Sequence, residues 1–253
     1  MSLPAVLITG GAKRIGAVIS RRFAKAGWHV VIHFSRAQEL AEALERELPS
    51  AEIVRCDLAD GAAAQAMIRG LATRLDDWRC LISNAAVFSP DTVTALDPVT
   101  NTHAMQVNAV TPALMAQTFL ADARSRGGRR VIQITDQKLA NPNPDFFSYT
   151  MSKAAADSAA TMLAMATAPD DRVYRLAPGA ILASHDQSEA ETEKSHRLNL
   201  LRRRTGADEV AEAALFLAQG PLASGQALFI DSGQHLLSQP RDVIYLARGD
   251  SAE

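Results

Sequence analysis

The sequence predicts a single α/β domain: a doubly wound parallel sheet of about seven strands with helices on both faces. Short apolar segments alternate with longer segments of helical periodicity along all 253 residues. Most short segments are apolar throughout, as expected for parallel strands that helices cover on both sides. No Pro/Gly/Ser-rich linker and no internal repeat divides the chain, so we expect one domain over residues 1–253.

The expected strands are four to six residues long and lie next to Gly or Pro. They are Ala5–Thr9, His29–His33, Glu52–Arg55, Cys80–Ser83, Arg130–Thr135, Arg172–Leu176 and Ala227–Ile230. The expected helices are Ile15–Ala26, Gln38–Leu48, Gly61–Arg74, Thr102–Ala123, Ser148–Ala168 and Asp208–Gln219. Strand and helix in regular alternation favour a parallel sheet, because each helix returns the chain to the same end of the sheet.

The composition points to an ordinary cytoplasmic protein. A formal net charge of −2 gives no reason to expect nucleic acid or an anionic membrane as a partner. The start of the chain lacks the pattern of a signal peptide, and no apolar run reaches the length of about eighteen residues that a membrane span needs. Cys56 and Cys80 adjoin expected strands, so we expect reduced thiols. Neither cysteine has metal-ligand spacing and the six histidines are scattered, so no metal site is expected.

A glycine-rich loop, TGGAKRIG, follows the first expected strand. Gly10 and Gly16 permit a tight turn and close backbone approach, and the next helix begins with free N–H groups that bind pyrophosphate. Lys13, Arg14 and Ile15 complete the loop, and Arg14 stands where a glycine often sits. There it adds a cation near phosphates or near an anionic substrate edge. The alternative is an ordinary strand-to-helix loop.

The end of the second strand indicates NADPH rather than NADH. An acid here would bond the ribose hydroxyls, whereas a basic residue accepts a 2′-phosphate. The sequence is His33, Phe34, Ser35 and Arg36, with no acid before Glu39. The alternative is that Arg36 only begins a solvated helix face.

Two further strand ends supply candidate cofactor contacts. Asp57, followed by Leu58, is placed to hold an adenine amino group, although a helix N-cap explains an Asp there equally well. Asn84, followed by Ala85 and Ala86, lies where the chain passes the ribose, although Asn also forms turns.

Tyr149 and Lys153 stand four residues apart on one helix face, and Asp136 precedes Tyr149 by thirteen residues. A nearby ammonium favours phenolate and lowers a tyrosine pKa that starts near 10. We therefore expect a proton donor that works near neutral pH. The alternative for Asp136 is a turn cap before the proline-containing residues 141–144.

These motifs, together with Asn108 and the Ala-Pro-Gly run at 177–179, resemble the short-chain dehydrogenase/reductase family across nearly the whole chain. The resemblance implies a Rossmann-like fold, with Tyr149 as proton donor and Lys153 also bonding the nicotinamide ribose. It implies that Asn108 helps to position a water-linked proton path. It also extends the cofactor site to Tyr149, Lys153, Pro178, Gly179 and Ile181.

Within that family the chain is most similar to the pteridine and dihydromonapterin reductases. Arg14 in the glycine loop, Asp136 in place of the family's serine, and Phe88 in place of the aromatic residue that stacks on pterin carry this resemblance. With Tyr149, these residues form the implied substrate site. A carboxylate would repel a developing alkoxide but can accept from the N–H groups of a pterin edge. Phe88 could instead be simple core.

The resemblance also assigns roles to two polar or terminal segments. Residues 182–204, the most polar stretch, would form a substrate lid. The tail at 236–253 carries Val243, Ile244, Tyr245 and Leu246, which are expected to pack on something. Relatives form tetramers, so we expect a homotetramer in which the tail contributes to an interface.

The expected function is NADPH-dependent transfer of hydride to the C=N bond of a dihydropterin of the dihydromonapterin or dihydrobiopterin kind, with dihydrofolate as a weaker substrate. One alternative is a short-chain carbonyl or 3-oxoacyl thioester reductase, against which Asp136 and the polar lid argue. Another is a non-catalytic NADP-binding sensor, which would have no need of Tyr149, Lys153 and Asn108.

Overall fold

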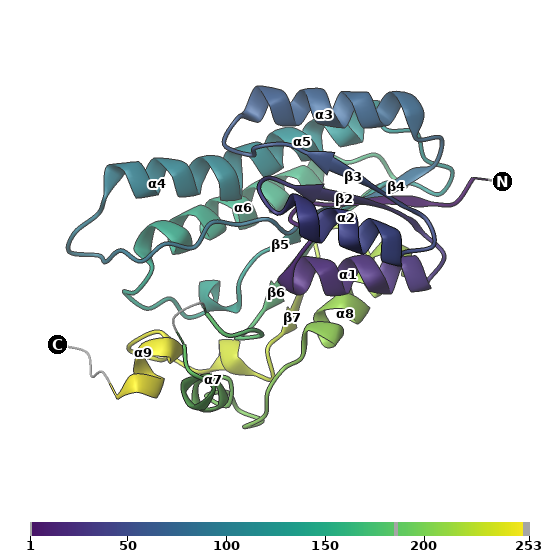
Figure 1. Cartoon of the computed structure of the whole chain (residues 1–253). Coiled ribbons are helices and arrows are strands. Elements are labelled where there is room, and N and C mark those ends of the chain that lie inside the picture. The colour runs from purple at the N-terminus through teal and green to yellow at the C-terminus, as the bar shows by residue number, and fades with distance from the viewer. Residues whose placement is uncertain (1, 185–186, 250–253) are drawn as a thin grey trace.

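The computed structural model describes residues 2–184 and 187–249, so parts of the predicted lid (185 and 186) and tail (250–253) lie outside the described residues. Within the described residues a seven-stranded parallel sheet has the order β3-β2-β1-β4-β5-β6-β7 (Figure 1). The strands are β1 (Ala5–Ile8), β2 (His29–Phe34), β3 (Ala51–Arg55), β4 (Trp78–Ser83), β5 (Arg130–Ile134), β6 (Arg172–Pro178) and β7 (Ala227–Ile230). The strand order reverses between β1 and β4, and a ligand crevice forms at such a switch point.

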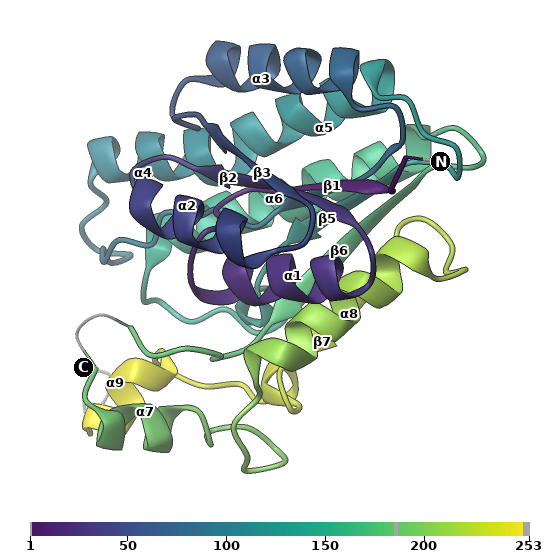
Figure 2. The ribbon, with the colours of Figure 1, turned by 45° about the vertical axis from the view of Figure 1, so that its right-hand side comes forward.

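Helices cover both faces of the sheet, as Figure 2 shows. On one face lie α1 (Arg14–Lys25), α2 (Gln38–Glu47) and α8 (Ala207–Gln219). On the other lie α3 (Gly61–Arg74), α5 (Thr111–Asp122) and α6 (Phe147–Ala166). The predicted doubly wound fold is therefore confirmed.

Each face has its own apolar core, because successive side chains of a strand point to opposite sides. In β1, Val6 and Ile8 pack with the α1 and α8 side, whereas Leu7 packs with the α3 and α5 side. Phe23 of α1 and Phe119 of α5 are fully buried in these two cores. The uniformly apolar strands thus follow from burial on both faces.

One predicted helix, Thr102–Ala123, has a different form. It consists of α4 (Pro98–Met105), a π-helical segment Gln106–Val110, and α5. The helix starts earlier than predicted because Asp97 caps it, accepting from the backbone N–H groups of Val99 and Thr100, and Pro98 suits the first turn. Such π segments are frequent at functional sites, and this one carries Asn108.

Two short helices that the sequence analysis did not predict, α7 (Glu189–Ser195) and α9 (Val243–Arg248), lie side by side beyond the sheet (Figure 1). The Lys194 Nζ donates to the carbonyl of Ala247 over 2.8 Å. Val243 and Ile244 are buried within this single chain. Val243 and Ile244 therefore pack on their own chain, and their apolar character is no evidence for a subunit interface.

Both cysteines are buried free thiols. Among residues 2–184 and 187–249, no helix combines the length and the apolar character needed to cross a bilayer.

Candidate active site

A cavity of about 590 Å³ opens at the carboxyl ends of the first four strands. Fourteen residues predicted to bind the cofactor line it: Gly10, Lys13, Arg14, Ile15, Gly16, His33, Phe34, Ser35, Arg36, Asp57, Leu58, Asn84, Ala85 and Ala86. The parallel strands bring these separate sequence positions to one edge of the sheet. The cavity therefore brings the predicted cofactor residues together, and binding of a dinucleotide there stays a prediction.

The glycine loop has the tight geometry that its sequence suggests. Gly10 has a φ of +62°, and a Cβ on Gly16 would lie 2.2 Å from the Gly10 carbonyl oxygen. Arg14 also has a positive φ, +53°, which explains why this place favours glycine. Its guanidinium donates to the carbonyl oxygens of Leu182 and Ala183, over 3.3 and 2.9 Å. Arg14 therefore links the glycine loop to the start of the predicted lid.

His33 lines the cavity as a neutral, buried group. Its Nδ1 accepts from the N–H of Gly10, and its Nε2 donates to the carbonyl of Cys56, each over 3.1 Å. Burial lowers the pKa of His33 to about 4. This side chain holds the glycine loop to the end of β3, so it contributes shape and not a cation.

Asn84 and Asp57 also have structural partners. The Asn84 side-chain amide donates to the carbonyl of Thr9 over 2.9 Å, and so fixes the end of β1. Asp57 accepts from the N–H of Ala59 over 3.0 Å, whereas the N-cap of α3 is Asp60. The helix-cap interpretation of Asp57 is therefore wrong. Contacts of Asn84 and Asp57 with a cofactor stay predictions.

The end of β2 presents positive charge to the cavity. Arg36 is exposed and forms no ion pair with any described residue. It precedes α2, which begins at Gln38, so it does not belong to a helix face. Lys13 and Ser35 line the same cavity. An exposed guanidinium without an internal partner is suited to a phosphate.

Asp136, Tyr149 and Lys153 come together at the carboxyl end of β5. The Tyr149 hydroxyl donates to Oδ2 of Asp136 over 2.7 Å. Oδ1 of Asp136 accepts from the backbone N–H of Lys138 over 2.8 Å, so this residue caps a turn and also binds the tyrosine. The Lys153 Nζ donates to the carbonyl of Ile134 over 2.9 Å and lies 5.7 Å from the centroid of the Tyr149 ring.

The predicted lowering of the Tyr149 pKa is wrong for this arrangement. Burial and the Asp136 carboxylate raise the pKa of Tyr149 well above its ordinary value. Burial lowers the pKa of Lys153 to about 8, and burial also raises the pKa of Asp136. The geometry explains the difference, because the hydrogen-bond partner of the phenol is the Asp136 carboxylate, whereas the Lys153 ammonium donates to the Ile134 carbonyl. At neutral pH Tyr149 is a protonated donor.

Asn108 is buried in the π-helical segment. Its Oδ1 accepts from the N–H of Val87, and its Nδ2 donates to the Val87 carbonyl and to Oγ of Ser152, all within 2.9 Å. It therefore joins the loop after β4 to α6, the helix that carries Tyr149. Its role in a proton path stays a prediction.

Phe88 is not a core residue, since 43% of it is exposed. Its ring stacks on Phe146 with centroids 4.1 Å apart and meets Tyr149 edge to face at 4.7 Å. An exposed aromatic ring beside the candidate proton donor is compatible with the predicted stacking on a flat substrate.

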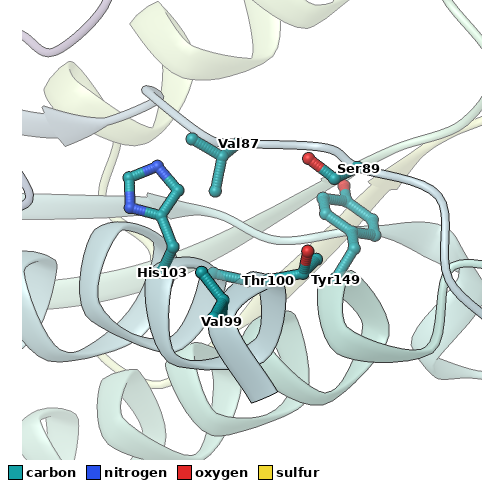
Figure 3. A pocket seen from close by; sticks show the side chains of 7 residues that line it. Val87, Ser89, Val99, Thr100, His103 and Tyr149 are labelled. Atoms are coloured by element: carbon teal, nitrogen blue, oxygen red, sulfur yellow. The ribbon is translucent and has the colours of Figure 1, made fainter. Parts of the chain in front are cut away.

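A smaller cavity of about 160 Å³ adjoins Tyr149 (Figure 3). Ser89 and Tyr149 lie on one side of it and His103 on the other, as Figure 3 shows. Val87 and His103 line both cavities, so the two are adjacent. The sequence analysis missed His103 and Val107, although their spacing of one helical turn places both on one face of the helix.

Five predicted cofactor residues do not line the larger cavity: Tyr149 and Lys153, at the carboxyl end of β5, and Pro178, Gly179 and Ile181. Pro178 ends β6, the Gly179 N–H donates to the carbonyl of Ile230, and Ile181 is buried. None of the five is among the described residues that line that cavity. Within the same described part, no group of three His, Cys, Asp or Glu side chains could hold a metal ion.

Known proteins resemble the chain over nearly its whole length. A family model described as enoyl-(acyl carrier protein) reductase matches residues 10–235. FolM alternative dihydrofolate reductase 1 from Brucella canis, solved in complex with NADP, has 32% identity and a TM-score of 0.87, covering 92% of this chain and 94% of its own.

Two curated proteins are similar at lower identity. One from Streptomyces violaceoruber, named as a ketoacyl reductase of the granaticin polyketide synthase, is 27% identical over 92% of this chain and 97% of its own length. The dihydromonapterin reductase of an Escherichia coli strain is 26% identical over 93% and 98%. From the matched family model and the fold, the chain belongs to the short-chain dehydrogenase/reductase family.

Proposed function

We propose that this protein uses NADPH to reduce the C=N bond of a dihydropterin to the tetrahydropterin. The observation that carries the proposal is the partly buried hydrogen bond from Tyr149 to Asp136. It places a proton donor and a carboxylate side by side, next to the exposed ring of Phe88.

The residues of the larger cavity fit NADPH. Gly16 leaves no room for a side chain against Gly10, as close backbone approach to a pyrophosphate requires. Arg36 and Ser35 at the end of β2, together with Lys13 of the glycine loop, offer cations and a hydroxyl for a 2′-phosphate. NADPH, when bound, supplies the hydride. The NADP complexes of the Brucella relatives support this assignment.

Tyr149 supplies the proton. Its phenol stays protonated at neutral pH and can pass a proton to the pterin nitrogen, directly or through water. Asp136 then serves either as acceptor for the N–H groups of the aminopyrimidinone edge or as the group that returns a proton to Tyr149. A carboxylate here would repel the oxyanion of a reduced ketone, which favours the pterin over a carbonyl substrate.

Phe88 would hold the substrate ring. Its exposed surface lies beside Tyr149, and base stacking on an aromatic side chain contributes about 1–3 kcal/mol. The names of the E. coli and Brucella relatives, which concern dihydromonapterin and dihydrofolate, support a pterin-containing substrate.

A second candidate is a ketoacyl or other carbonyl reductase. The similarity to the granaticin ketoacyl reductase is as high as that to the dihydromonapterin reductase, and the matched family is described by an acyl carrier protein substrate. Asp136 argues against this candidate for the electrostatic reason above.

Oxidation of NADPH with dihydromonapterin, dihydrobiopterin, dihydrofolate, simple ketones and a 3-oxoacyl thioester separates the candidates. Turnover of dihydropterins is expected, with dihydrofolate slower. Turnover of ketones or thioesters alone would favour the second candidate. Tight NADPH binding without any turnover would favour a sensor. Asp136→Ser should lower pterin turnover by about tenfold or more, and unchanged pterin kinetics would remove Asp136 from the mechanism.

We further propose a homotetramer. Large apolar side chains are exposed on α4 and α6, namely Val99, Met151, Met162 and Met165, and on α8 and β7, namely Phe216 and Phe229. Burial of such side chains between subunits would favour an assembly. Light scattering at micromolar concentration tests this, and a stable monomer would contradict it.

A further inference from the structure

The loop that carries Asp136 is joined to the C-terminal tail by a buried ion pair. Lys138 is only 5% exposed, and its Nζ lies 3.3 Å from Oδ2 of Asp242. The same Nζ donates to the carbonyl of Asp145 over 2.6 Å. We call residues 136–147 the Asp136 loop and residues 241–245 the tail segment; they lie about a hundred positions apart in the chain.

Two further contacts join the same segments. The Asp145 carboxylate accepts from Nε of Arg241 over 2.9 Å and from the backbone N–H of Asp242 over 2.7 Å. Phe146 lies between two rings, stacked on Phe88 at 4.1 Å and on Tyr245 at 5.8 Å. The tail segment thus holds the loop at both its start and its end.

These contacts reach the reacting groups through one residue. The backbone N–H of Lys138 donates to Asp136, while its side chain pairs with Asp242. Among the groups that raise the pKa of Tyr149, burial comes first, then Asp136, and the Asp242 carboxylate adds to them. Asp242 also raises the pKa of Asp136, on which burial acts most strongly.

We propose that Lys138 and Asp242 are positioning residues, through which the C-terminal tail orients Asp136 and sets the charge beside the Asp136–Tyr149 pair. The charged groups around that pair are Lys153 from α6, Lys138 from the Asp136 loop, and Asp242 from the tail segment. Asp145 and Arg241 are paired with each other just beyond. Because Lys138 neutralises Asp242, loss of either residue changes both the position of the loop and the local field.

The direct test observes Tyr149 without substrate or cofactor. The chain has only three tyrosines, so ¹³Cζ-tyrosine labelling gives three NMR signals, and Tyr149→Phe assigns one of them. In Asp242→Asn, ionisation of Tyr149 should begin at a pH lower by about half a unit or more. Asn keeps the N-cap that Asp242 provides for α9, so the tail helix is retained. An unchanged Tyr149 titration overturns the proposal.

The kinetic test rests on the proposed function. Lys138→Met and Asp242→Asn should each lower kcat/KM for a dihydropterin by about tenfold, and the double variant should be no worse than the poorer single variant. The KM for NADPH should not change. Fully additive losses would contradict the coupling. If the wild-type protein reduces no dihydropterin, the proposed function fails, while the NMR result still decides the role of Asp242.

Arg129→Met is the matched control. Arg129 forms a partly buried ion pair with Asp171 at 2.7 Å, beside the first residues of β5 and β6, at the opposite end of the sheet from the site. Arg129→Met should lower the stability of the protein without changing the pH at which Tyr149 ionises. If this control lowers that pH as much as Asp242→Asn does, the effect of Asp242→Asn is only a general loss of structure.

Discussion

The two halves of the site are held together in different ways. In the cofactor half, neutral side chains bind backbone groups of neighbouring strand ends: His33 bridges Gly10 and Cys56, and Asn84 binds Thr9. In the catalytic half, charged groups are buried or half-buried: Lys153, Asp136 and the Lys138–Asp242 pair.

This difference has an energetic meaning. Neutral, fully bonded groups give the cofactor cavity a fixed shape at little cost. Buried charges oppose folding unless they are paired, so the charged groups of the catalytic half lower the stability of the folded protein. Substitutions should therefore harm binding in the first half and raise stability at some positions of the second.

The largest expected effect lies in the catalytic half. Tyr149→Phe removes the proton donor and should lower kcat by about 10²–10⁴-fold. NADPH affinity, measured by fluorescence titration, should stay within about twofold of wild type, because Tyr149 does not line the larger cavity and Phe keeps the ring. A variant that retains more than a tenth of wild-type turnover would exclude Tyr149 as the donor.

In the cofactor half, Gly16→Ala should cause the largest loss of NADPH affinity. Its Cβ would lie 2.2 Å from the Gly10 carbonyl oxygen, so the loop must open and NADPH affinity should fall by about a hundredfold. Gly70→Ala is the matched control, since Gly70 lies within α3 with nothing within 4 Å of the added carbon. This control should gain about 0.5–1 kcal/mol of stability and keep its affinity. Equal NADPH affinity in the two variants would contradict the assignment of the glycine loop.

Lys153→Met tests the cost of buried charge. The folded pKa of Lys153, about 8, lies below its ordinary value of 10.5, so the folded state binds this proton more weakly than the unfolded state does. Below pH 8 the buried Lys153 ammonium lowers the free energy of unfolding by its full amount. This loss decreases as the pH rises from 8 towards 10.5. Urea unfolding without cofactor should show the variant more stable by up to about 3 kcal/mol at pH 7. The gain should shrink above pH 8, and a constant difference would mean that Lys153 is not destabilised by burial.

The smallest expected effect concerns the choice of cofactor. Arg36→Gln removes the exposed guanidinium at the cavity, and should raise the Kd of NADPH by about tenfold while leaving that of NADH unchanged. Binding titrations with both cofactors measure this ratio. Equal losses for the two would show that Arg36 does not contact the 2′-phosphate.

The cofactor half was the more predictable. Its residues follow strand ends, and the parallel order of the sheet brings such ends to one edge, so position in the sequence predicted position in space for fourteen residues. The function of His33 was not predictable, because its partners, Gly10 and Cys56, become neighbours only when β1, β2 and β3 pair.

The sequence predicted which residues lie in the catalytic half, but not the charge interactions between them. The helical spacing of Tyr149 and Lys153 suggested an ammonium beside the phenol. In the fold, the Lys153 Nζ donates to the Ile134 carbonyl, and Asp136 accepts a hydrogen bond from the Tyr149 hydroxyl. Spacing along a helix fixes the face on which two residues lie, but not which group from another element comes between them.

The sequence by itself determined the alternation of strands and helices, the glycine loop and the choice of candidate reacting groups, because each depends on local pattern or on motif. Only the tertiary structure decided the protonation state of Tyr149, the neutral role of His33 and the contact of the tail with the Asp136 loop. Those depend on burial and on pairing between segments up to 104 residues apart, and neither is written in any local stretch of sequence.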